Sequence, residues 1–360
     1  MALILLLTSN TLYAQPDLKT RLDAFFAGQS TNQPGFALSI EKNGSILYRN
    51  AAGLADIDTR TPIDSLTNFR MASVTKQFTA MGILLLEKDG ALNVDDPIGR
   101  WLPEIPANLG QRILIRHLLT HSSGILDYES LIPSNQTTQV LDADVLRLLS
   151  RHDSTYFIPG TRFQYSNSGF CLLALIIERA SKKPYARFLH DRIFAPLHMD
   201  NSTVYEAGQP IPHRAMGYAR DSSGHIIPSD QSITSATKGD GGVYTSLSDY
   251  ARWINALQHN ILIPLAPTLR RLRFPINDMP GKSYAAGWFI QLDSPQLLFH
   301  SGSTCGFANF VIQLPGDSWS LVYFSNIAEN TTPFKTILTI LKDTGYPDLS
   351  SVFALHDQTR

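Results

Sequence analysis

The segment at residues 73–85 reads SVTKQFTAMGILL, and it predicts a helix with one buried face. Its apolar residues recur at spacings of four, three and four from Val74 to Leu85, which is the periodicity of an amphipathic helix. Residues three apart lie on the same side of a helix. Ser73 and Lys76 are therefore expected to point in the same direction.

A serine and a lysine at this spacing can form a nucleophile and its activating base. A serine hydroxyl is a poor nucleophile until a neighbouring group removes its proton. A lysine can remove it only in its neutral form, which desolvation or a nearby positive charge favours. Backbone N–H groups at a helix N-terminus also stabilise a developing oxyanion. Since Ser-x-x-Lys is common on solvated helix surfaces, Ser73 and Lys76 need partners elsewhere in the chain.

The first candidate partner is Tyr165-Ser166-Asn167, on a loop just before an apolar helix. A phenol can relay a proton if a cation lowers its pKa. A carboxamide can hold both a lysine ammonium and a substrate carbonyl. The alternative is structural, with an aromatic ring that packs and an asparagine that caps the helix.

The second candidate partner is His300-Ser301-Gly302-Ser303, at the end of a predicted strand. A glycine there lets a substrate backbone lie against the strand edge. The Ser303 N–H can then complete an oxyanion hole with the Ser73 N–H. The alternative is an ordinary strand end with His300 hydrogen-bonded at the surface.

Predicted strands lie at both ends of the chain, with helical patterns between them. Alternating residues on either side of Asn43-Gly44 predict a hairpin. The other predicted strands are Gly287–Leu292, Leu297–His300, Phe307–Leu314 and Ser320–Ser325. Apolar spacings predict terminal helices at residues 17–26 and 334–341. We therefore predict an α+β fold with an antiparallel sheet flanked by helices, and an inserted, mainly helical lobe.

We expect one catalytic domain over residues 15–345. Its sheet lobe covers about residues 15–70 and 283–345, and its helical lobe covers about residues 71–282. Residues 346–360 would form a C-terminal tail. A boundary between two lobes is a common location for a binding site.

Composition excludes some classes of partner. The chain has 360 residues, 43% of them hydrophobic, and a net charge of −1. No basic field is present to bind nucleic acid or an anionic membrane. We expect a small-molecule or peptide substrate, and the sequence leaves the oligomeric state open.

The N-terminus resembles an export signal. Met1 to Leu7 reads MALILLL, and a small residue, Ala14, offers a cleavage site. No Lys or Arg precedes the run, so a frayed terminus is the alternative. The run is too short to span a bilayer. We expect a secreted or periplasmic protein without a membrane span.

Neither cysteines nor histidines indicate a metal or cofactor. Cys171 and Cys305 are the only cysteines, and we prefer two buried free thiols to one disulfide. His117 and His121 stand four apart, but they lack the H-E-x-x-H pattern and an evident third ligand. We expect them to stabilise a loop, and we expect no cofactor.

Together, Ser-x-x-Lys, Tyr-Ser-Asn and His-Ser-Gly resemble the serine β-lactamase and penicillin-binding protein superfamily. The combination is similar to class C β-lactamases and their relatives, which include D-alanyl-D-alanine carboxypeptidases, D-aminopeptidases and class VIII esterases. The resemblance runs from about Phe36 to Ser325. It includes the stretches at residues 117–124, 196–199 and 239–253.

This resemblance implies roles for the candidate residues. Ser73 would attack a carbonyl and form an acyl-enzyme, which water then hydrolyses. Lys76 and Tyr165 would share the proton transfers, and which of them is the base stays open. Asn167 would orient Lys76 and the substrate amide. Ser73 and Ser303 would supply the oxyanion N–H groups.

His300 stands where many β-lactamases have lysine. Histidine is mostly neutral near pH 7, which weakens the case for an efficient β-lactamase. The leading prediction is a serine hydrolase acting on D-amino-acid peptides or related amides and esters, similar to a D-Ala-D-Ala carboxypeptidase. The alternatives are an esterase or weak class C-type β-lactamase and, in another class, a catalytically silent penicillin-recognising protein.

Overall fold

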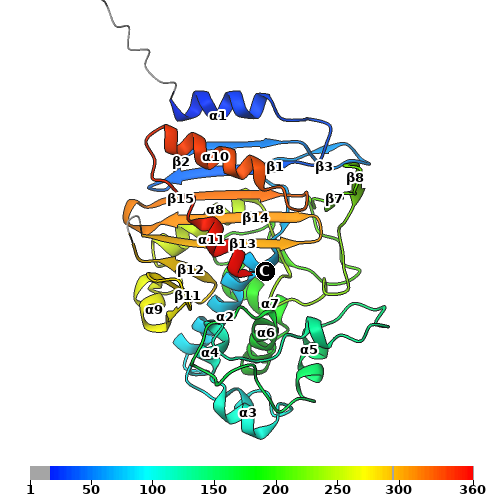
Figure 1. Cartoon of the computed structure of the whole chain (residues 1–360), viewed down its shortest axis with the longest axis vertical. Helices are drawn as coiled ribbons and strands as arrows, with labels where there is room; N and C mark the ends of the chain where they lie inside the picture. The colour runs from blue at the N-terminus through cyan, green and yellow to red at the C-terminus, as the bar shows by residue number, and fades with distance from the viewer. Residues whose placement is uncertain (1–16, 294–295, 360) are drawn as a thin grey trace, which may run out of the picture.

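The computed structural model describes residues 17–293 and 296–359 of the chain. Its centre is an eight-stranded sheet in the order β10-β11-β12-β13-β14-β15-β1-β2, antiparallel at every pairing (Figure 1). Strand β15 (Trp319–Ser325) pairs with β1 (Phe36–Lys42), so the two ends of the chain build adjacent strands. The predicted α+β class is confirmed.

The other strands of the sheet are β2 (Ser45–Ala52), β10 (Phe274–Pro275), β11 (Lys282–Ala285), β12 (Trp288–Gln291), β13 (Leu297–Thr304) and β14 (Phe307–Leu314). Three smaller sheets are also present. Two of them have two strands each, β3 (Leu54–Asp56) with β4 (Thr61–Pro62) and β7 (Tyr218–Arg220) with β8 (Ile226–Pro228). In the third, β9 (Val243–Thr245) lies between β5 (Phe69–Arg70) and β6 (Thr203–Val204).

The predicted hairpin is present between β1 and β2. Its turn residues Asn43 and Gly44 have φ values of 52° and 73°. Two successive positive φ values are what a tight two-residue hairpin turn requires, and Asn-Gly meets that requirement at low cost.

Helices cover both faces of the sheet. Helices α1 (Leu18–Ala27) and α10 (Thr331–Asp343) pack together on one face, and α8 (Leu247–Gln258) contacts β1 and β15 from the other (Figure 1). Because the sheet is covered on both sides, all eight residues of β14 are buried. The region expected as a C-terminal tail includes α11 (Val352–His356), which contacts β13.

The long middle of the chain forms the helical part in the lower half of Figure 1, where α2 and α6 pack together. Its α-helices are α2 (Lys76–Lys88), α3 (Ala107–Arg112), α4 (Ile115–Leu119), α5 (Asp142–Leu149), α6 (Asn167–Ser181) and α7 (Tyr185–Leu189), and α9 (Leu265–Leu272) follows beside the sheet. Short helical turns are η1 (Ala72–Thr75), η2 (Ile98–Arg100), η3 (Glu129–Leu131), η4 (His190–Phe194), η5 (Pro315–Asp317) and η6 (Asp357–Thr359). The division into two lobes stays a prediction.

Two boundaries differ from the sequence predictions. The α-helix predicted from Ser73 begins at Lys76, because Ser73 lies in the 3₁₀ turn η1. The strand predicted over residues 297–300 continues to Thr304, because its last residues pair with β14 as far as Phe307. The candidate residues Gly302 and Ser303 therefore belong to a paired strand.

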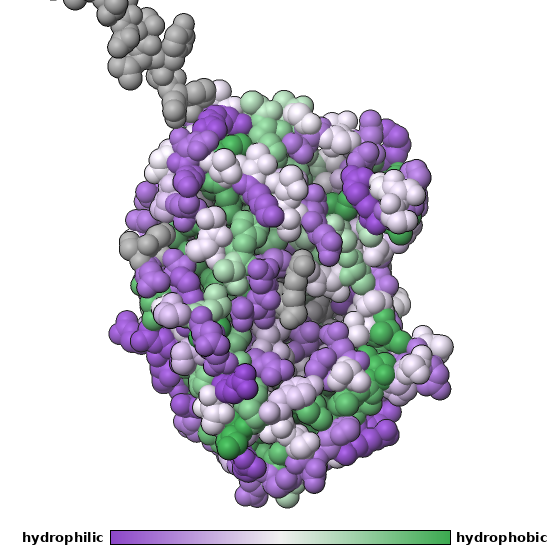
Figure 2. All heavy atoms as spheres, viewed as in Figure 1, coloured by the Kyte–Doolittle hydropathy of each residue, from purple (hydrophilic) through white to green (hydrophobic). Residues whose placement is uncertain are grey.

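Hydrophobic residues at the surface are scattered among polar ones on the face seen in Figure 2. Across the described ranges, none of the helices combines the length and apolar character needed to cross a membrane. The predicted export segment at residues 1–14 lies outside the described residues. Both cysteines are free, but only Cys171 is buried, whereas Cys305 is partly exposed.

Candidate active site

The buried side chain of Lys76 lies at the centre of the candidate site. Its Nζ atom is 3.0 Å from Ser73 Oγ, 2.8 Å from Asn167 Oδ1 and 3.0 Å from the backbone oxygen of Asp240. Ser73 is partly exposed, which the nucleophile role expected of it from the sequence requires. The structure thus brings together three sequence-predicted residues from η1, α2 and the start of α6.

This arrangement gives the lysine nitrogen a defined orientation. Besides the bond to its carbon chain, a neutral amine has two N–H groups and one lone pair. The Asn167 and Asp240 oxygens are carbonyl acceptors, so they must face N–H groups. As an ammonium, Lys76 donates to all three oxygens, including Ser73 Oγ; in the neutral amine the lone pair takes the direction of Ser73 Oγ. In its neutral form Lys76 is oriented to accept the proton of the Ser73 hydroxyl.

The turn that carries Ser73 is tightly packed against the sheet. Ala72 has a φ of 48°, an unusual value for a residue other than glycine. Gly302 of β13 approaches this turn so closely that a Cβ atom at position 302 would collide with the Met71 carbonyl oxygen and lie 3.0 Å from the Ser73 nitrogen. Glycine at 302 is therefore required for the approach of β13 to the turn that carries Ser73.

Tyr165 lies beside the lysine. The centre of its ring is 4.9 Å from Lys76 Nζ. Its hydroxyl is buried and has no hydrogen-bond partner within the described part of the chain. The His121 ring packs on the Tyr165 ring with 4.2 Å between centres. The phenol is thus held by packing on its ring, while its oxygen stays available.

His121 has a local structural role that agrees with the loop-stabilising role expected from sequence. Its Nδ1 accepts a hydrogen bond from the Ser166 backbone N–H at 3.0 Å. Burial, with the charge of Lys76 adding to it, holds the pKa of His121 well below its usual value. A neutral imidazole in this place links the loop after α4 to the loop that carries Tyr165.

His300 is on the same strand face as Gly302 but is fully buried. Its Nδ1 lies 2.6 Å from the Ser301 backbone oxygen, and its Nε2 lies 3.0 Å from the Tyr284 hydroxyl. A carbonyl oxygen only accepts, so Nδ1 donates and Nε2 accepts from Tyr284. Burial, reinforced by Lys76, lowers the pKa of His300 to about 3. The expected substrate-binding side chain is neutral here, and both its nitrogens are engaged.

Asn167 connects the lysine to a carboxylate that the sequence analysis missed. Its Nδ2 donates to Glu129 Oε1 at 3.1 Å. Glu129 is an exposed residue in η3, yet desolvation by the atoms around its carboxyl group raises its pKa. Sequence offered no signal for this contact, because Glu129 lies in a loop without a readable pattern.

The segment at residues 238–242 supplies the third partner of Lys76. The stretch Gly239-Asp240-Gly241-Gly242 stood out in the sequence without a role. A Cβ atom at Gly239 would collide with the Phe170 backbone oxygen, so the segment packs directly on α6. This close approach brings the Asp240 carbonyl to the lysine.

Ser303 is exposed on β13 and faces Ala308 of β14. It lines a surface hollow of about 620 Å³ together with Thr304, Cys305 and Phe307. Its backbone N–H is the second oxyanion donor expected from the sequence, and that role stays a prediction.

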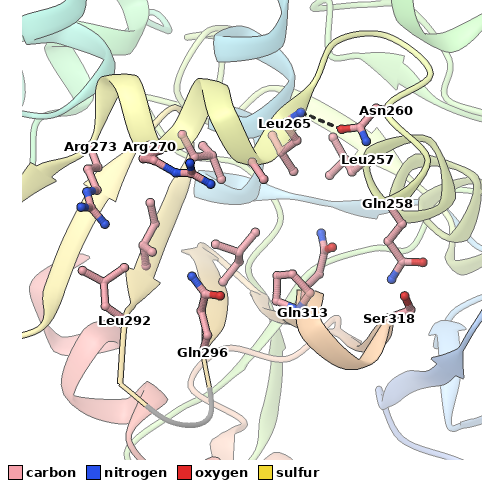
Figure 3. A pocket seen from close by; sticks show the side chains of 15 residues that line it. Leu257, Gln258, Asn260, Leu265, Arg270, Arg273, Leu292, Gln296, Gln313 and Ser318 are labelled. Carbon is pink, nitrogen blue, oxygen red and sulfur yellow. Dashed lines mark hydrogen bonds between the residues drawn. The ribbon is translucent and has the colours of Figure 1, made fainter.

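A second cavity, of about 310 Å³, lies between α8, α9 and the sheet (Figure 3). Leu257, Leu265, Leu292, Arg270 and Arg273 are among its lining residues, and none of the predicted site residues is. In the described residues there is also no group of three or more metal-binding side chains.

Comparison with known proteins gives a consistent result. A family model described as Beta-lactamase matches residues 22–345. Penicillin-binding protein 4* of Bacillus subtilis (strain 168) is 34% identical over 330 residues, which cover 86% of this chain and 72% of that protein. The chain spans only 62% of the length of another relative, Protein flp of Staphylococcus aureus (strain N315), to which it is 28% identical.

Two solved structures share the fold. A penicillin binding protein from Bacillus halodurans aligns with a TM-score of 0.78 and 25% identity, over 91% of this chain and 100% of that one. D-amino acid amidase from Ochrobactrum anthropi SV3, complexed with L-phenylalanine amide, aligns with a TM-score of 0.73 and 25% identity, over 91% of this chain and 98% of that one.

Proposed function

Because this chain belongs to the Beta-lactamase family and is a serine hydrolase of that kind, we propose that it hydrolyses amides or esters of D-amino acids through an acyl-enzyme on Ser73. The observation that carries the proposal is the set of three hydrogen bonds made by Lys76. Two carbonyl partners orient its nitrogen, and the third partner is the hydroxyl to be activated.

The proposed reaction begins when neutral Lys76 takes the proton of the Ser73 hydroxyl. The Ser73 oxygen attacks the substrate carbonyl carbon, and the carbonyl oxygen becomes an oxyanion near the Ser73 and Ser303 N–H groups. Collapse of this intermediate breaks the bond to the leaving group, which takes a proton from Tyr165. Tyr165 regains its proton from Lys76. Neutral Lys76 then takes a proton from a water molecule as its oxygen attacks the ester carbonyl carbon. The bond to Ser73 Oγ breaks, Lys76 returns the proton to that oxygen, and the acid is released.

Two side chains favour a substrate with a free amino group over one with a carboxylate. His300 is neutral and its nitrogens are engaged, so it offers no cation to a carboxylate. The Glu129 carboxyl group accepts from Asn167 Nδ2, and Asn167 Oδ1 in turn contacts Lys76 Nζ. Asn167 therefore links a carboxyl group to the lysine. A D-Ala-D-Ala peptide end and a β-lactam both carry a carboxylate, whereas an unacylated D-amino-acid amide carries an ammonium. The name of the amidase neighbour agrees with the second class.

Glu129→Gln is expected to lower kcat/KM for D-alanine p-nitroanilide by about tenfold, which corresponds to ~1.4 kcal/mol. The reason is that the variant loses the negative charge that would attract the substrate ammonium. Hydrolysis of N-acetyl-D-alanine p-nitroanilide, which has no ammonium, should change little. Asp153→Asn, which removes an exposed carboxylate on the loop after α5, is the control. Equal losses on both anilides would contradict the assigned preference.

The function itself is tested by intact-protein mass spectrometry after incubation with a substrate panel. The panel contains D- and L-alanine p-nitroanilides, a p-nitrophenyl ester, benzylpenicillin and a D-Ala-D-Ala peptide. We expect turnover of the D-anilide and the ester, and an adduct that maps to Ser73. A protein that is labelled by penicillin but turns over none of the substrates would instead be the catalytically silent binding protein.

We also propose that the protein is exported to the periplasm or the exterior, on the pattern of residues 1–14. Fractionation of cells that express the full chain, with and without residues 1–14, would test this. A protein retained in the cytoplasm in both cases would contradict export.

A further inference from the structure

The segment at residues 238–242 is held from two sides near Lys76. On one side, the Thr79 hydroxyl of α2 donates to the Gly239 backbone oxygen at 2.6 Å. On the other side, the segment delivers the Asp240 backbone oxygen to Lys76 Nζ. The position of this carbonyl therefore depends on what fixes the backbone of residues 238 and 239.

Asp142 fixes that backbone with both oxygens of its carboxylate. Oδ2 accepts from the Lys238 N–H at 2.9 Å, and Oδ1 accepts from the Gly239 N–H at 3.2 Å. Asp142 is the first residue of α5, far from Lys76 along the chain, and it is buried. Hydrogen bonds from N–H groups to a carboxylate are stronger than those between neutral groups.

We propose that Asp142 is a positioning residue for the reaction, because its carboxylate holds residues 238–242 where the Asp240 carbonyl orients the Lys76 amine. The inference rests on the proposed function of Ser73 and Lys76. Without the Asp240 carbonyl, Lys76 has one carbonyl acceptor, and its lone pair is free to turn away from Ser73 Oγ.

The surroundings of Asp142 explain why a carboxylate in this place depends on the two N–H groups. Burial raises the pKa of Asp142 to about 7, and the Asp240 carboxylate adds to the effect, while the Lys238 and Gly239 N–H groups oppose it. The Cys171 thiol also contacts Asp142. Protonation would replace one acceptor oxygen by a hydroxyl that faces an N–H group. The Asp142 carboxyl group therefore accepts both hydrogen bonds only in its ionised form.

The test is Asp142→Asn, in which an amide NH₂ group would face one of the two N–H groups. We expect the rate constant for acylation of Ser73 to fall about 10- to 100-fold with little change in KM, because misplacement of a catalytic group by about 1 Å is enough for such a loss. We also expect the part of the acid limb that protonation of Asp142 causes to disappear, because burial raises the pKa of Asp142 to about 7 and asparagine does not titrate.

The matched control is Asp144→Asn, two residues further along α5. Its carboxylate pairs with Arg147 and accepts from the Leu141 N–H, and the amide oxygen of asparagine can still accept that bond. The control variant should leave both the rate constant and the pH profile unchanged. Thr79→Val removes the hydroxyl that donates to the Gly239 oxygen, and we expect a smaller loss of rate while the acid limb caused by Asp142 remains. This second variant decides the question if Asp142→Asn does not fold.

The outcomes separate the inference from the function on which it rests. Wild-type protein that forms no adduct on Ser73 would overturn the proposed function and the inference with it. Wild-type acylation together with wild-type rates and pH profiles in both variants would overturn the inference alone. A lowered melting temperature with an unchanged acid limb would also reject positioning in favour of a purely structural role.

Discussion

Lys76→Ala is expected to slow acylation of Ser73 by about 10⁴-fold, which is the scale of losing an essential general base. In the wild-type chain the amine is 3.0 Å from Ser73 Oγ and is oriented by Asn167 and Asp240. Alanine leaves no group there to take the serine proton. The measurement is the rate of adduct formation by intact mass, with the melting temperature recorded in parallel.

Two companion variants make this result specific. Lys88→Ala removes a lysine at the other end of α2, where its amine only contacts the Leu262 backbone oxygen, and should acylate normally. Ser73→Ala should show no adduct at all. If Lys76→Ala acylated at the wild-type rate, the lysine would not be the base, and Tyr165 would take that role.

Gly302→Ala is expected to lower both stability and activity. The added Cβ would meet the Met71 carbonyl oxygen and approach the Ser73 nitrogen to 3.0 Å, so the strand and the nucleophile turn must separate. Overpacking of this kind costs about 1–3 kcal/mol. We expect acylation to fall by about 100-fold or more, because the turn that carries the nucleophile moves. Thermal unfolding and the acylation rate measure the two effects.

Gly316→Ala is the control for this substitution. Gly316 lies in η5 at a turn between two strands of the same sheet, and a Cβ there would meet no atom within 4 Å. Its effect on stability should stay within about 0.5 kcal/mol, as for most surface changes. Wild-type acylation in Gly302→Ala would show that β13 can retreat without disturbing Ser73.

Much of the fold could be predicted from the sequence, because helices and hairpins depend on patterns among neighbouring residues. The apolar spacing after Val74 identified α2, and Asn43-Gly44 identified the β1–β2 hairpin, whose turn has the two positive φ values that this dipeptide favours. Strand β11 was missed, since its four residues, Lys-Ser-Tyr-Ala, include no β-branched residue and only one aromatic. The end of β13 was also missed, because pairing with β14 extends the strand beyond its apolar run.

By itself the sequence determined which residues to examine: Ser73 and Lys76 share a side because their spacing on a helical turn is a local property, and the Tyr-Ser-Asn and His-Ser-Gly stretches carried a family resemblance. Only the tertiary structure decided their partners. The Tyr284 hydroxyl engages His300, Glu129 reaches Asn167, and Asp142 holds the segment that faces Lys76. Hydrogen bonds between residues far apart in the chain depend on how helices and strands pack, and no periodicity or spacing along a single sequence records that packing.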